Sequence, residues 1–543
     1  MQTDCEMEAD RGLTDIENPC QAVLNNSDLL SEIFGQLPFS KGGLLHVALT
    51  CRTFSKPALE KLWRHLGNII SLFKVLSNFC FRMDGKTRTW YFDGPVIEEG
   101  VQRLLYYGSL VRSLGSLAYT GWGCFGDRVF LLIARALAGR PLLPNLQGLT
   151  LIFRSNGDDP AILHLIHSPQ LQSFNFSAPR NFSRIDDITL FVQKHAKAPN
   201  MRKLTIDCLS TLPVVQTSTS FQNLVELSLS TGPSVPIPTS VIYHWSSLKS
   251  LREMSIEARA FEKTLDGPTS KPCFKLLQML NLACPLDAAI IFLSTAAFPV
   301  LSKLSFEFML PQSPTLQVYP WARMFEALQR STSSRFQELH VELWEDSTSE
   351  CTLRNKQFTA SYPGVPFTDL EATLLHFKLS HFGIYMPLLQ PLTSEDAVKI
   401  RDAWPKISTL VLVTKAVEPR LDLKALKHFS DESWKDLGDL ELAVDAAHIP
   451  LPRKVRSTHK LHSLTLQLVN WEDSEFDDLC SLASYIDSLF PYVYCTSFTT
   501  SSGQILEDVA GMINALQMGR RRERRYNETA TVEDDYEDDD LSD

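Results

Sequence analysis

One short pattern of apolar and polar positions recurs along most of the chain. An apolar residue is followed by two variable positions, a second apolar residue, one variable position and a third apolar residue. The last two apolar residues are two positions apart, so they face the same side of a β-strand. Twelve copies occur, and their starts are separated by 23 to 38 residues. The copies are LQGLTL (146–151), LQSFNF (171–176), MRKLTI (201–206), LVELSL (224–229), LREMSI (251–256), LQMLNL (277–282), LSKLSF (301–306), FQELHV (336–341), LLHFKL (374–379), ISTLVL (407–412), LGDLEL (437–442) and LHSLTL (461–466).

Helical patterns lie between the copies, at residues 185–196, 286–297, 321–330 and 394–403. A strand and a helix within about 25 residues are typical of a leucine-rich-repeat unit. A single unit cannot bury its apolar strand face, whereas stacked units can. We therefore expect an α/β solenoid with a curved parallel sheet and helices on its convex side. The alternative, a doubly wound α/β sheet, needs longer apolar strands and a glycine-rich phosphate turn, and the sequence contains neither.

The segment before the repeats has three helical patterns within residues 24–66. The first is capped by Ser27 or Asp28 and ends at Pro38, the second follows Gly42 and Gly43, and the third covers residues 55–66. Three short helices can barely bury a core alone, so such a module is more stable when a partner covers its remaining apolar surface.

This segment resembles the F-box. The match runs through DLLSEIFGQLP (28–38), LLHVALTCRTF (44–54) and ALEKLWRHL (58–66), and its most specific parts are CRTF and LWRHL. The chain is most similar to the expanded F-box group of mushroom-forming (basidiomycete) fungi, whose members carry irregular leucine-rich repeats. Asn25 and Asn26 stand where Leu-Pro is usual, so the first helix lacks a rigid start.

The resemblance implies a substrate-recognition subunit of a cullin-based, SCF-type ubiquitin ligase, which leads its target to protein degradation. The F-box would bind a Skp-family adaptor, and through it a cullin, while the repeats would hold the target protein. The side chains expected at the adaptor are apolar residues at helical spacing, of which several could instead hold the three helices together: Leu29, Leu30, Ile33, Phe34, Leu37, Pro38, Leu44, Leu45 and Leu49. Trp63 fits the helical core better. The alternative function is a non-catalytic leucine-rich-repeat scaffold that does not act in ubiquitination.

The strand face that would hold a target is acidic. The third, fifth and seventh positions of each copy should point to the open face of the sheet. Only Lys203, Lys303 and Lys378 are basic there, against Asp439, Glu441 and seven further acids: Asp207, Glu226, Glu253, Glu257, Glu307, Glu338 and Glu342. One hypothesis is that this face binds a basic segment of the target through electrostatic steering. The alternative is a solvated face that is acidic for solubility.

No enzymatic motif accompanies these elements. The sequence has no GxxxxGK[ST], GxGxxG, HExxH or GxSxG pattern, so we expect a non-catalytic protein without cofactor or metal. Cys51 belongs to the F-box pattern and fits a packed side chain better than a nucleophile. His164 and His167 lie three residues apart without a nearby ligand partner, which favours a surface pair.

Charge and cysteine content narrow the class further. The 52 basic and 63 acidic residues give a net charge of −11, which argues against nucleic-acid binding. The eleven cysteines form no CxxC pair and no signal peptide is recognisable, so we expect reduced thiols in the cytoplasm or nucleus. The longest uncharged apolar stretch, residues 288–302, is too short to span a membrane.

The chain's expected organisation has five parts. Residues 1–22 are a disordered acidic N-terminus, 23–68 the F-box, and 69–140 a helical linker and cap. Residues 141–492 are the solenoid of about twelve irregular repeats, with a closing helix at 473–490. Residues 493–543 are a C-terminal extension and a disordered tail, in which five arginines (within 520–525) precede an acidic run. The arginines could form a nuclear-import signal or fold back on the acids.

Overall fold

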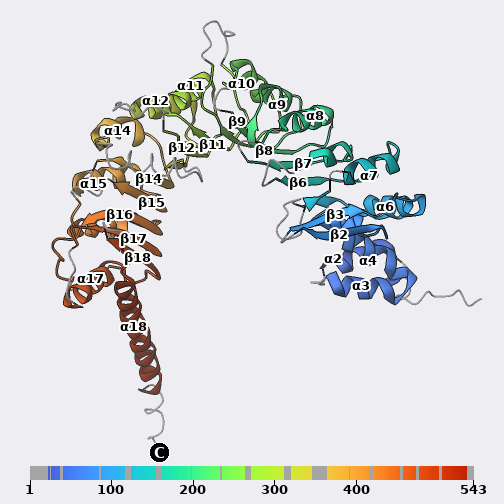
Figure 1. Ribbon diagram of the computed structural model, residues 1–543. Coiled ribbons are helices and arrows are strands. Elements are labelled where there is room, and N and C mark those ends of the chain that lie inside the picture. Colours follow the sequence, from blue (N-terminus) through green and yellow to red (C-terminus); the bar gives the residue numbers. More distant parts are fainter. Residues whose placement is uncertain are drawn as a thin grey trace, which may run out of the picture. The chain divides into compact units, whose positions relative to one another are not determined.

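The structure is a computed structural model (Figure 1). It divides into two compact units, Met1–Leu209 and Ser210–Asp543. It describes residues 23–24, 26–36, 41–84, 87–115, 124–126, 128–153, 160–179, 182–196, 198–232, 235–262, 271–310, 320–344, 364–390, 392–414, 421–452, 457–471, 476–500 and 504–534. The expected disordered N-terminus, residues 1–22, lies outside this description.

Three helices at the start of the first unit pack around a small apolar core, as predicted. They are α2 (Ser27–Gln36), α3 (Lys41–Thr50) and α4 (Arg52–Arg64). The buried core consists of Leu30, Phe34, Leu44, Ala48 and Ala58. Such a module buries little surface, because small domains have a high ratio of surface to volume.

The first helix is capped by Asn26 rather than by the predicted Ser27 or Asp28. The Oδ1 atom of Asn26 accepts hydrogen bonds from the amides of Asp28 and Leu29, at 3.0 and 3.1 Å. These amides have no partner within the helix, and asparagine is among the best residues for this role. Asn26 therefore satisfies the start of α2 at the place where the F-box usually has a proline.

The region predicted as a helical linker and cap also contains a small second sheet. Its helices are α5 (Ile70–Phe73), α6 (Glu98–Leu110) and α7 (Val129–Leu137). Its strands are β2 (Phe79–Asp84), β3 (Thr87–Phe92) and β5 (Cys124–Phe125), in the order β2-β3-β5. The alternation of large apolar residues in β2 and β3 has a period of two, which favours strands over helix. The linker and cap, predicted to be helical, thus contain helices α5 to α7 and, in addition, the strands β2, β3 and β5.

The repeat sheet of the first unit has parallel strands in the order β1-β4-β6-β7-β8. They are β1 (His65–Leu66), β4 (Ser113–Leu114), β6 (Gly148–Ile152), β7 (Ser173–Ser177) and β8 (Lys203–Ser210), accompanied by η1 (Pro160–His164) and α8 (Ile185–His195). Leu66 pairs with Leu114, and Leu114 with Leu149. The sheet thus begins at residue 65, well before the predicted start at 141. The sequence pattern did not reveal β1 and β4, because strands of two residues are too short to carry it.

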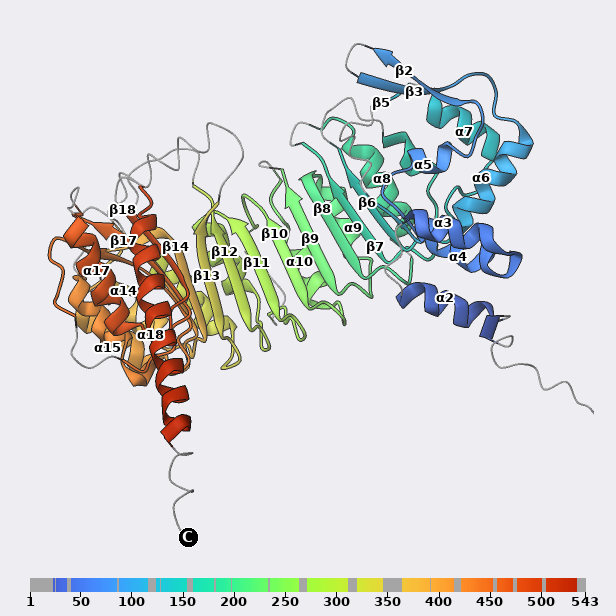
Figure 2. The same cartoon turned by 90° about the horizontal axis from the view of Figure 1, so that it is seen from below.

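The second unit contains ten parallel strands that pair in the order of the sequence. These strands are β9 (Glu226–Thr231), β10 (Glu253–Glu257), β11 (Met279–Cys284), β12 (Lys303–Phe308), β13 (Glu338–Leu343), β14 (His381–Leu389), β15 (Thr409–Thr414), β16 (Asp439–Asp445), β17 (Ser463–Val469) and β18 (Cys495–Thr500). Figure 2 shows these strands with their helices behind them. The helices are α9 (Leu212–Ser218), α10 (Thr239–Ser246), α11 (Leu286–Thr295), α12 (Trp321–Ser331), α14 (Phe367–Leu374), α15 (Ser394–Ala403), α16 (Leu426–Phe429), α17 (Phe476–Leu489) and α18 (Glu507–Asp534), with short turns η2 (Leu423–Ala425) and η3 (Glu432–Trp434).

Rows of apolar side chains run across this sheet and form its core. Leu280, Leu304, Leu339 and Phe382 pair in register on successive strands, and all are fully buried. Burying one such side chain stabilises the fold by about 1.5–3 kcal/mol. Each strand therefore depends on its neighbours for a buried face, which confirms the predicted α/β solenoid.

Eleven of the twelve predicted hexamers lead into a strand that begins at their third residue. The exception is LLHFKL, because Leu374 ends α14 and the strand starts only at His381. The hexamer LSHFGI, five residues later, has the same pattern and is the one used: Phe382 and Ile384 pair with Leu339 and Val341. A thirteenth strand, β18, was missed because Thr496 interrupts its apolar pattern.

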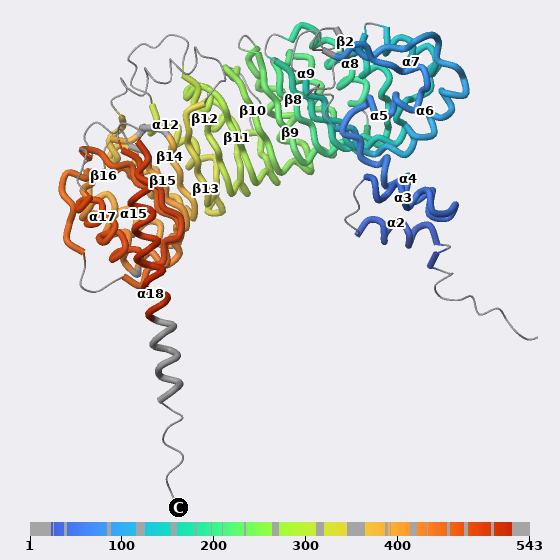
Figure 3. Tube along the Cα trace, turned by 60° about the horizontal axis from the view of Figure 1, so that its bottom comes forward, coloured from blue at the N-terminus to red at the C-terminus, as the bar shows by residue number. Residues whose placement is uncertain are grey.

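The C-terminal end of the second unit is a pair of helices, α17 and α18 (Figure 3). Helix α17 is the predicted closing helix, but β18 pairs with β17, so the sheet continues beyond residue 492. Helix α18 extends to Asp534 and includes residues 520–525. The structure thus differs from the predicted disordered segment at the arginines, whereas residues 535–543 lie outside the described residues. Among the described helices, none is long and apolar enough to cross a membrane.

Candidate protein-interaction surfaces

The apolar residues predicted to bind an adaptor divide into two groups in the three-helix module. Leu30, Phe34 and Leu44 are buried in the core of the module itself. The remaining four described residues are exposed, at 42% for Leu29, 41% for Ile33, 46% for Leu45 and 75% for Leu49. Leu37 and Pro38 lie outside the described residues.

The exposed group follows the helical repeat. Leu29 and Ile33 are four residues apart on α2, and Leu45 and Leu49 are four residues apart on α3, so each pair shares one helix face. The buried core of the module contains none of these four residues. Within that core, Phe34 packs edge-on against Phe54, with ring centroids 5.8 Å apart. The four exposed side chains are therefore available to another protein.

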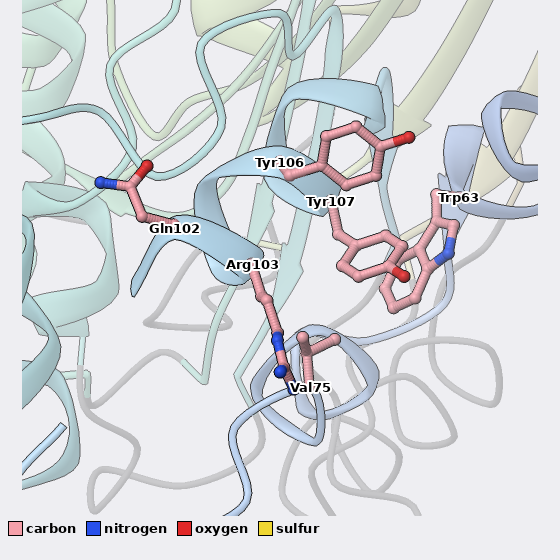
Figure 4. A pocket seen from close by; sticks show the side chains of 6 residues that line it. All are labelled: Trp63, Val75, Gln102, Arg103, Tyr106 and Tyr107. Carbon is pink, nitrogen blue, oxygen red and sulfur yellow. The ribbon is translucent and has the colours of Figure 1, made fainter. Parts of the chain in front are cut away.

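Trp63, predicted to be a core residue, instead lines an open aromatic groove in the first unit. The ring centroids of Trp63 and Tyr107 are 4.6 Å apart, and those of Tyr106 and Tyr107 are 5.1 Å apart. Figure 4 shows these three side chains. The groove has a volume of about 630 Å³ and is completed by Val75, Gln102 and Arg103. Arg103 is engaged by Glu99 on the same helix, so the groove's exposed chemistry is mainly that of its aromatic rings.

The acids predicted on the repeat face lie on the strands where they were expected. Asp207 belongs to β8 of the first unit, where its Oδ2 accepts a hydrogen bond from the hydroxyl of Ser177 at 2.9 Å. The other acids belong to the second unit and alternate with buried apolar residues: Glu226, Glu253, Glu257, Glu307, Glu338, Glu342, Asp439 and Glu441. The shifted strand β14 removes Lys378 from this face.

One row of this face, at the amino ends of the strands, contains its own counter-charges. Glu226 and Glu253 are in register, as are Lys303 and Glu338 on β12 and β13. Lys303 Nζ lies 3.3 Å from Glu338 Oε2, and His381 Nδ1 lies 3.9 Å from Glu338 Oε1. The row therefore combines acids with a lysine and a histidine.

A second row, at the carboxyl ends of β10 to β13, has three acids and no basic residue. Glu257, Ala283, Glu307 and Glu342 pair in register across β10 to β13. Burial, together with the charges of Glu342 and Glu257, raises the pKa of Glu307 above its usual range. The neighbouring like charges thus disfavour the ionisation of Glu307.

Tyr385 continues this second row on β14. It follows Ile384, the last residue of β14 that pairs with β13, and the nearby carboxylates of Glu441 and Glu342 both raise its pKa, together with burial. Its ring stacks on His340 with centroids 6.1 Å apart and planes at 20°. The ring also lies over Gly383, where a Cβ would be 2.6 Å from Tyr385 Cε2. Sequence reasoning missed Tyr385 because it placed the strand five residues too early.

His164 and two buried cysteines have structural neighbours in the described part of the chain. No group of three or more His, Cys, Asp and Glu among them could hold a metal ion. The neighbour of His164 is a carboxylate: its Nε2 atom lies 3.3 Å from Asp187 Oδ1. Cys208 and Cys284 are buried thiols, and burial raises the pKa of Cys208 to about 12. A thiol with so high a pKa is a poor nucleophile.

Comparisons with known proteins give only distant structural similarities. No family model and no curated protein matches the chain. A leucine-rich-repeat protein of Leptospira interrogans is 13% identical, with a TM-score of 0.32, over 79% of this chain and 98% of its own. An internalin of Listeria monocytogenes is 11% identical, with a TM-score of 0.28, over 65% and 81% of the two chains. A chain of the yeast Rad7 and Elc1 complex is 13% identical, with a TM-score of 0.27, over 72% and 87%.

Similarities at this level say nothing of function. The leucine-rich-repeat fold of the chain follows from its own geometry, in which parallel strands recur in register with a helix or short turn between most of them. Such solenoids present one extended sheet face to other proteins.

Proposed function

We propose that this protein is the substrate-recognition subunit of a cullin-based, SCF-type ubiquitin ligase. Its three-helix module would be an F-box that binds a Skp-family adaptor, and its repeat sheet would bind the target protein. The observation that carries the proposal is the exposure of Leu29, Ile33, Leu45 and Leu49 on a module whose core is already filled.

The energetics of these side chains suit a helix-in-groove contact. Apolar anchors at helical spacing dock in a groove of the partner, and each large anchor contributes about 1.5–3 kcal/mol when it is fully buried. Four such anchors contribute about 6–12 kcal/mol at full burial, a range that includes the roughly 8 kcal/mol of a micromolar complex, before the cost of association is subtracted. The same contact would cover the apolar surface that the small module leaves exposed.

The proposed role requires no catalytic side chain in this chain. A receptor subunit acts by proximity, because it holds an acceptor lysine of the target at high effective concentration near the conjugating enzyme. The repeat face supplies the holding surface and the three-helix module supplies the attachment.

Co-purification of the full chain with a Skp-family adaptor and a cullin tests the proposal. We expect the triple variant Leu29→Ala, Ile33→Ala and Leu49→Ala to bind the adaptor at least about a hundredfold more weakly. The matched control is Leu131→Ala with Leu190→Ala, since these leucines are also exposed on helices of the first unit. The control should bind like the wild type.

Two results would contradict the proposal. In the first, the triple variant retains the adaptor as well as the wild type does. In the second, the wild-type chain stays monomeric in the presence of adaptor and cullin, which would favour the scaffold function. Substitution of Leu30 or Phe34 is unsuitable here, because these residues hold the module together.

A further inference from the structure

The open sheet face of the second unit differs in charge between its two ends. At the amino ends of β12 and β13, Lys303 is paired with Glu338, and His381 lies beside the same carboxylate. At the carboxyl ends, Glu307 and Glu342 are neighbours in register, and no ion pair is formed by either within the described part of the chain. On β10 to β13, negative charge is therefore higher at the carboxyl ends than at the amino ends.

The paired positions of this row, from β10 to β13, hold no basic residue. Position 283, between Glu257 and Glu307, is an alanine. Arg259, beyond the end of β10, has its guanidinium over the ring of Trp344, 5.7 Å from the ring centroid. The hydroxyl of Ser230 donates a hydrogen bond of 2.7 Å to Glu257 but carries no charge. A cationic partner would complement the carboxylates of Glu307 and Glu342.

An aromatic ring completes the edge on its β14 side. Tyr385 is 44% exposed, lies near Glu342 and is supported from below by Gly383 and from the side by His340. Carboxylates next to a tyrosine ring provide the two contacts that a guanidinium uses best. These are bidentate hydrogen bonds to a carboxylate and stacking on an aromatic face.

We propose that the carboxyl ends of β10 to β14 form the docking surface for an arginine-bearing segment of the target protein. Glu307 and Glu342 would receive the guanidinium, and Tyr385 would stack on it. This deepens the proposed function, since it names the chemistry of the target. It does not depend on the adaptor, so the two proposals can fail separately.

Arginine is favoured over lysine for a physical reason. The ammonium group of lysine is a strongly hydrated point charge, whereas the guanidinium is planar, weakly hydrated and able to bond two carboxylate oxygens at once. A surface that acted only through its net negative charge would bind both residues equally. The preference for arginine therefore distinguishes a shaped surface from a general electrostatic field.

Fluorescence anisotropy with the full chain and three labelled peptides tests this surface. The first peptide has four Arg-Gly-Ser repeats, and in the other two every arginine is replaced by lysine or by citrulline. We expect the arginine peptide to bind at least about fivefold more tightly than the lysine peptide, and the citrulline peptide to show no binding. Binding should weaken when salt is raised from about 0.05 to 0.3 M.

Two double variants of equal charge locate the site. Glu307→Gln with Glu342→Gln should weaken binding of the arginine peptide at least about tenfold. Glu226→Gln with Glu253→Gln removes the same amount of charge from the amino-end row. This second double variant should change the affinity for the arginine peptide less than about twofold. Tyr385→Leu should abolish the preference for arginine over lysine. Circular dichroism would verify that each variant is folded.

Several outcomes would overturn the proposal. They are equal losses in the two double variants, equal binding of the arginine and lysine peptides by the wild type, or no binding of the arginine peptide. Adaptor co-purification with the Glu307→Gln and Glu342→Gln variant should be unchanged, so failure here leaves the proposed F-box role intact.

Discussion

The guanidinium of Arg520 on α18 donates hydrogen bonds to both carboxylate oxygens of Asp487 on α17. The Nη2–Oδ1 distance is 2.6 Å, the Nη1–Oδ2 contact completes the bidentate pair, and Nη2 also donates to the carbonyl of Pro491 at 3.1 Å. The side chains are only 15% and 4% exposed, so this pair joins the last two helices from within. Arg520 thus holds α18 to α17, a structural role that the cluster of arginines in the sequence did not indicate.

Removal of one partner from this buried pair should destabilise the end of the second unit. Arg520→Ala would leave the carboxylate of Asp487 buried without its counter-charge, at a cost of about 3–5 kcal/mol. Urea unfolding, together with hydrogen exchange in α17 and α18, would measure the loss. Arg521→Ala is the matched control, because Arg521 is exposed and should change stability by less than about 0.5 kcal/mol.

The double variant Asp487→Leu with Arg520→Met sharpens this test. Apolar replacement of both partners is often neutral, so we expect it to recover most of the stability. If Arg520→Ala were as stable as the wild type, the pair would not hold the two helices together.

In the three-helix module, buried and exposed apolar residues should respond differently to truncation. Phe34→Ala removes a core ring that packs on Phe54 and should cost about 3–5 kcal/mol. Leu49→Ala should change stability by less than about 0.5 kcal/mol, because Leu49 is 75% exposed. Thermal unfolding of the full chain, followed by hydrogen exchange in α2 to α4, would measure the loss of stability in each variant. Comparable losses would mean that Leu49 packs within the module.

Stability should depend on the protonation of Glu307. Its pKa is raised in the folded protein by burial and by Glu342 and Glu257, so ionisation is disfavoured in the folded state. The stability linked to this carboxyl is present below its unfolded pKa and is lost as pH rises through the folded pKa. Glu307→Gln should therefore be more stable than the wild type at pH 7.

This gain should shrink as the pH falls through the raised pKa of Glu307 towards its ordinary value, since the carboxyl is then protonated in both states. Urea unfolding of both proteins across this range would measure the difference. Glu253→Gln is the control, because Glu253 is exposed on the same face. A Glu307→Gln variant that is less stable than the wild type at pH 7 would disprove the repulsion.

The titration of His340 should report the position of Tyr385. Burial is the main cause that lowers the pKa of His340, Lys303 and His381 lower it further, and Glu338 opposes them. Tyr385→Ala removes the ring that stacks on His340, so the pKa should rise towards its ordinary value. Proton NMR of the histidine ring across the pH range would measure this change.

Gly383→Ala tests in a second way whether the ring of Tyr385 affects the pKa of His340. A Cβ at this position would be 2.6 Å from Tyr385 Cε2 and 3.1 Å from His340 Nδ1, so the tyrosine ring must move away. We expect the pKa of His340 to rise in this variant as well. An unchanged titration in both variants would show that Tyr385 does not cover His340.

The sequence by itself determined the architecture, because the repeat pattern and its helical intervals are local features. Eleven hexamers begin strands at their third residue, and residues 394–403 form a helix with the predicted bounds. Alternation with a period of two and spacing of three or four residues follow from strand and helix geometry alone. The acids on the strand faces could be placed for the same reason.

Tertiary structure decided what several local patterns left open. LLHFKL and LSHFGI satisfy the same pattern, and only pairing of Phe382 with Leu339 selects the second frame and brings Tyr385 near Glu342. Within the predicted adaptor set, helical spacing alone could not separate Leu30, which is buried, from Leu29, which is exposed. Burial and charge pairing depend on which elements pack together, and this is a property of the folded chain rather than of any short segment.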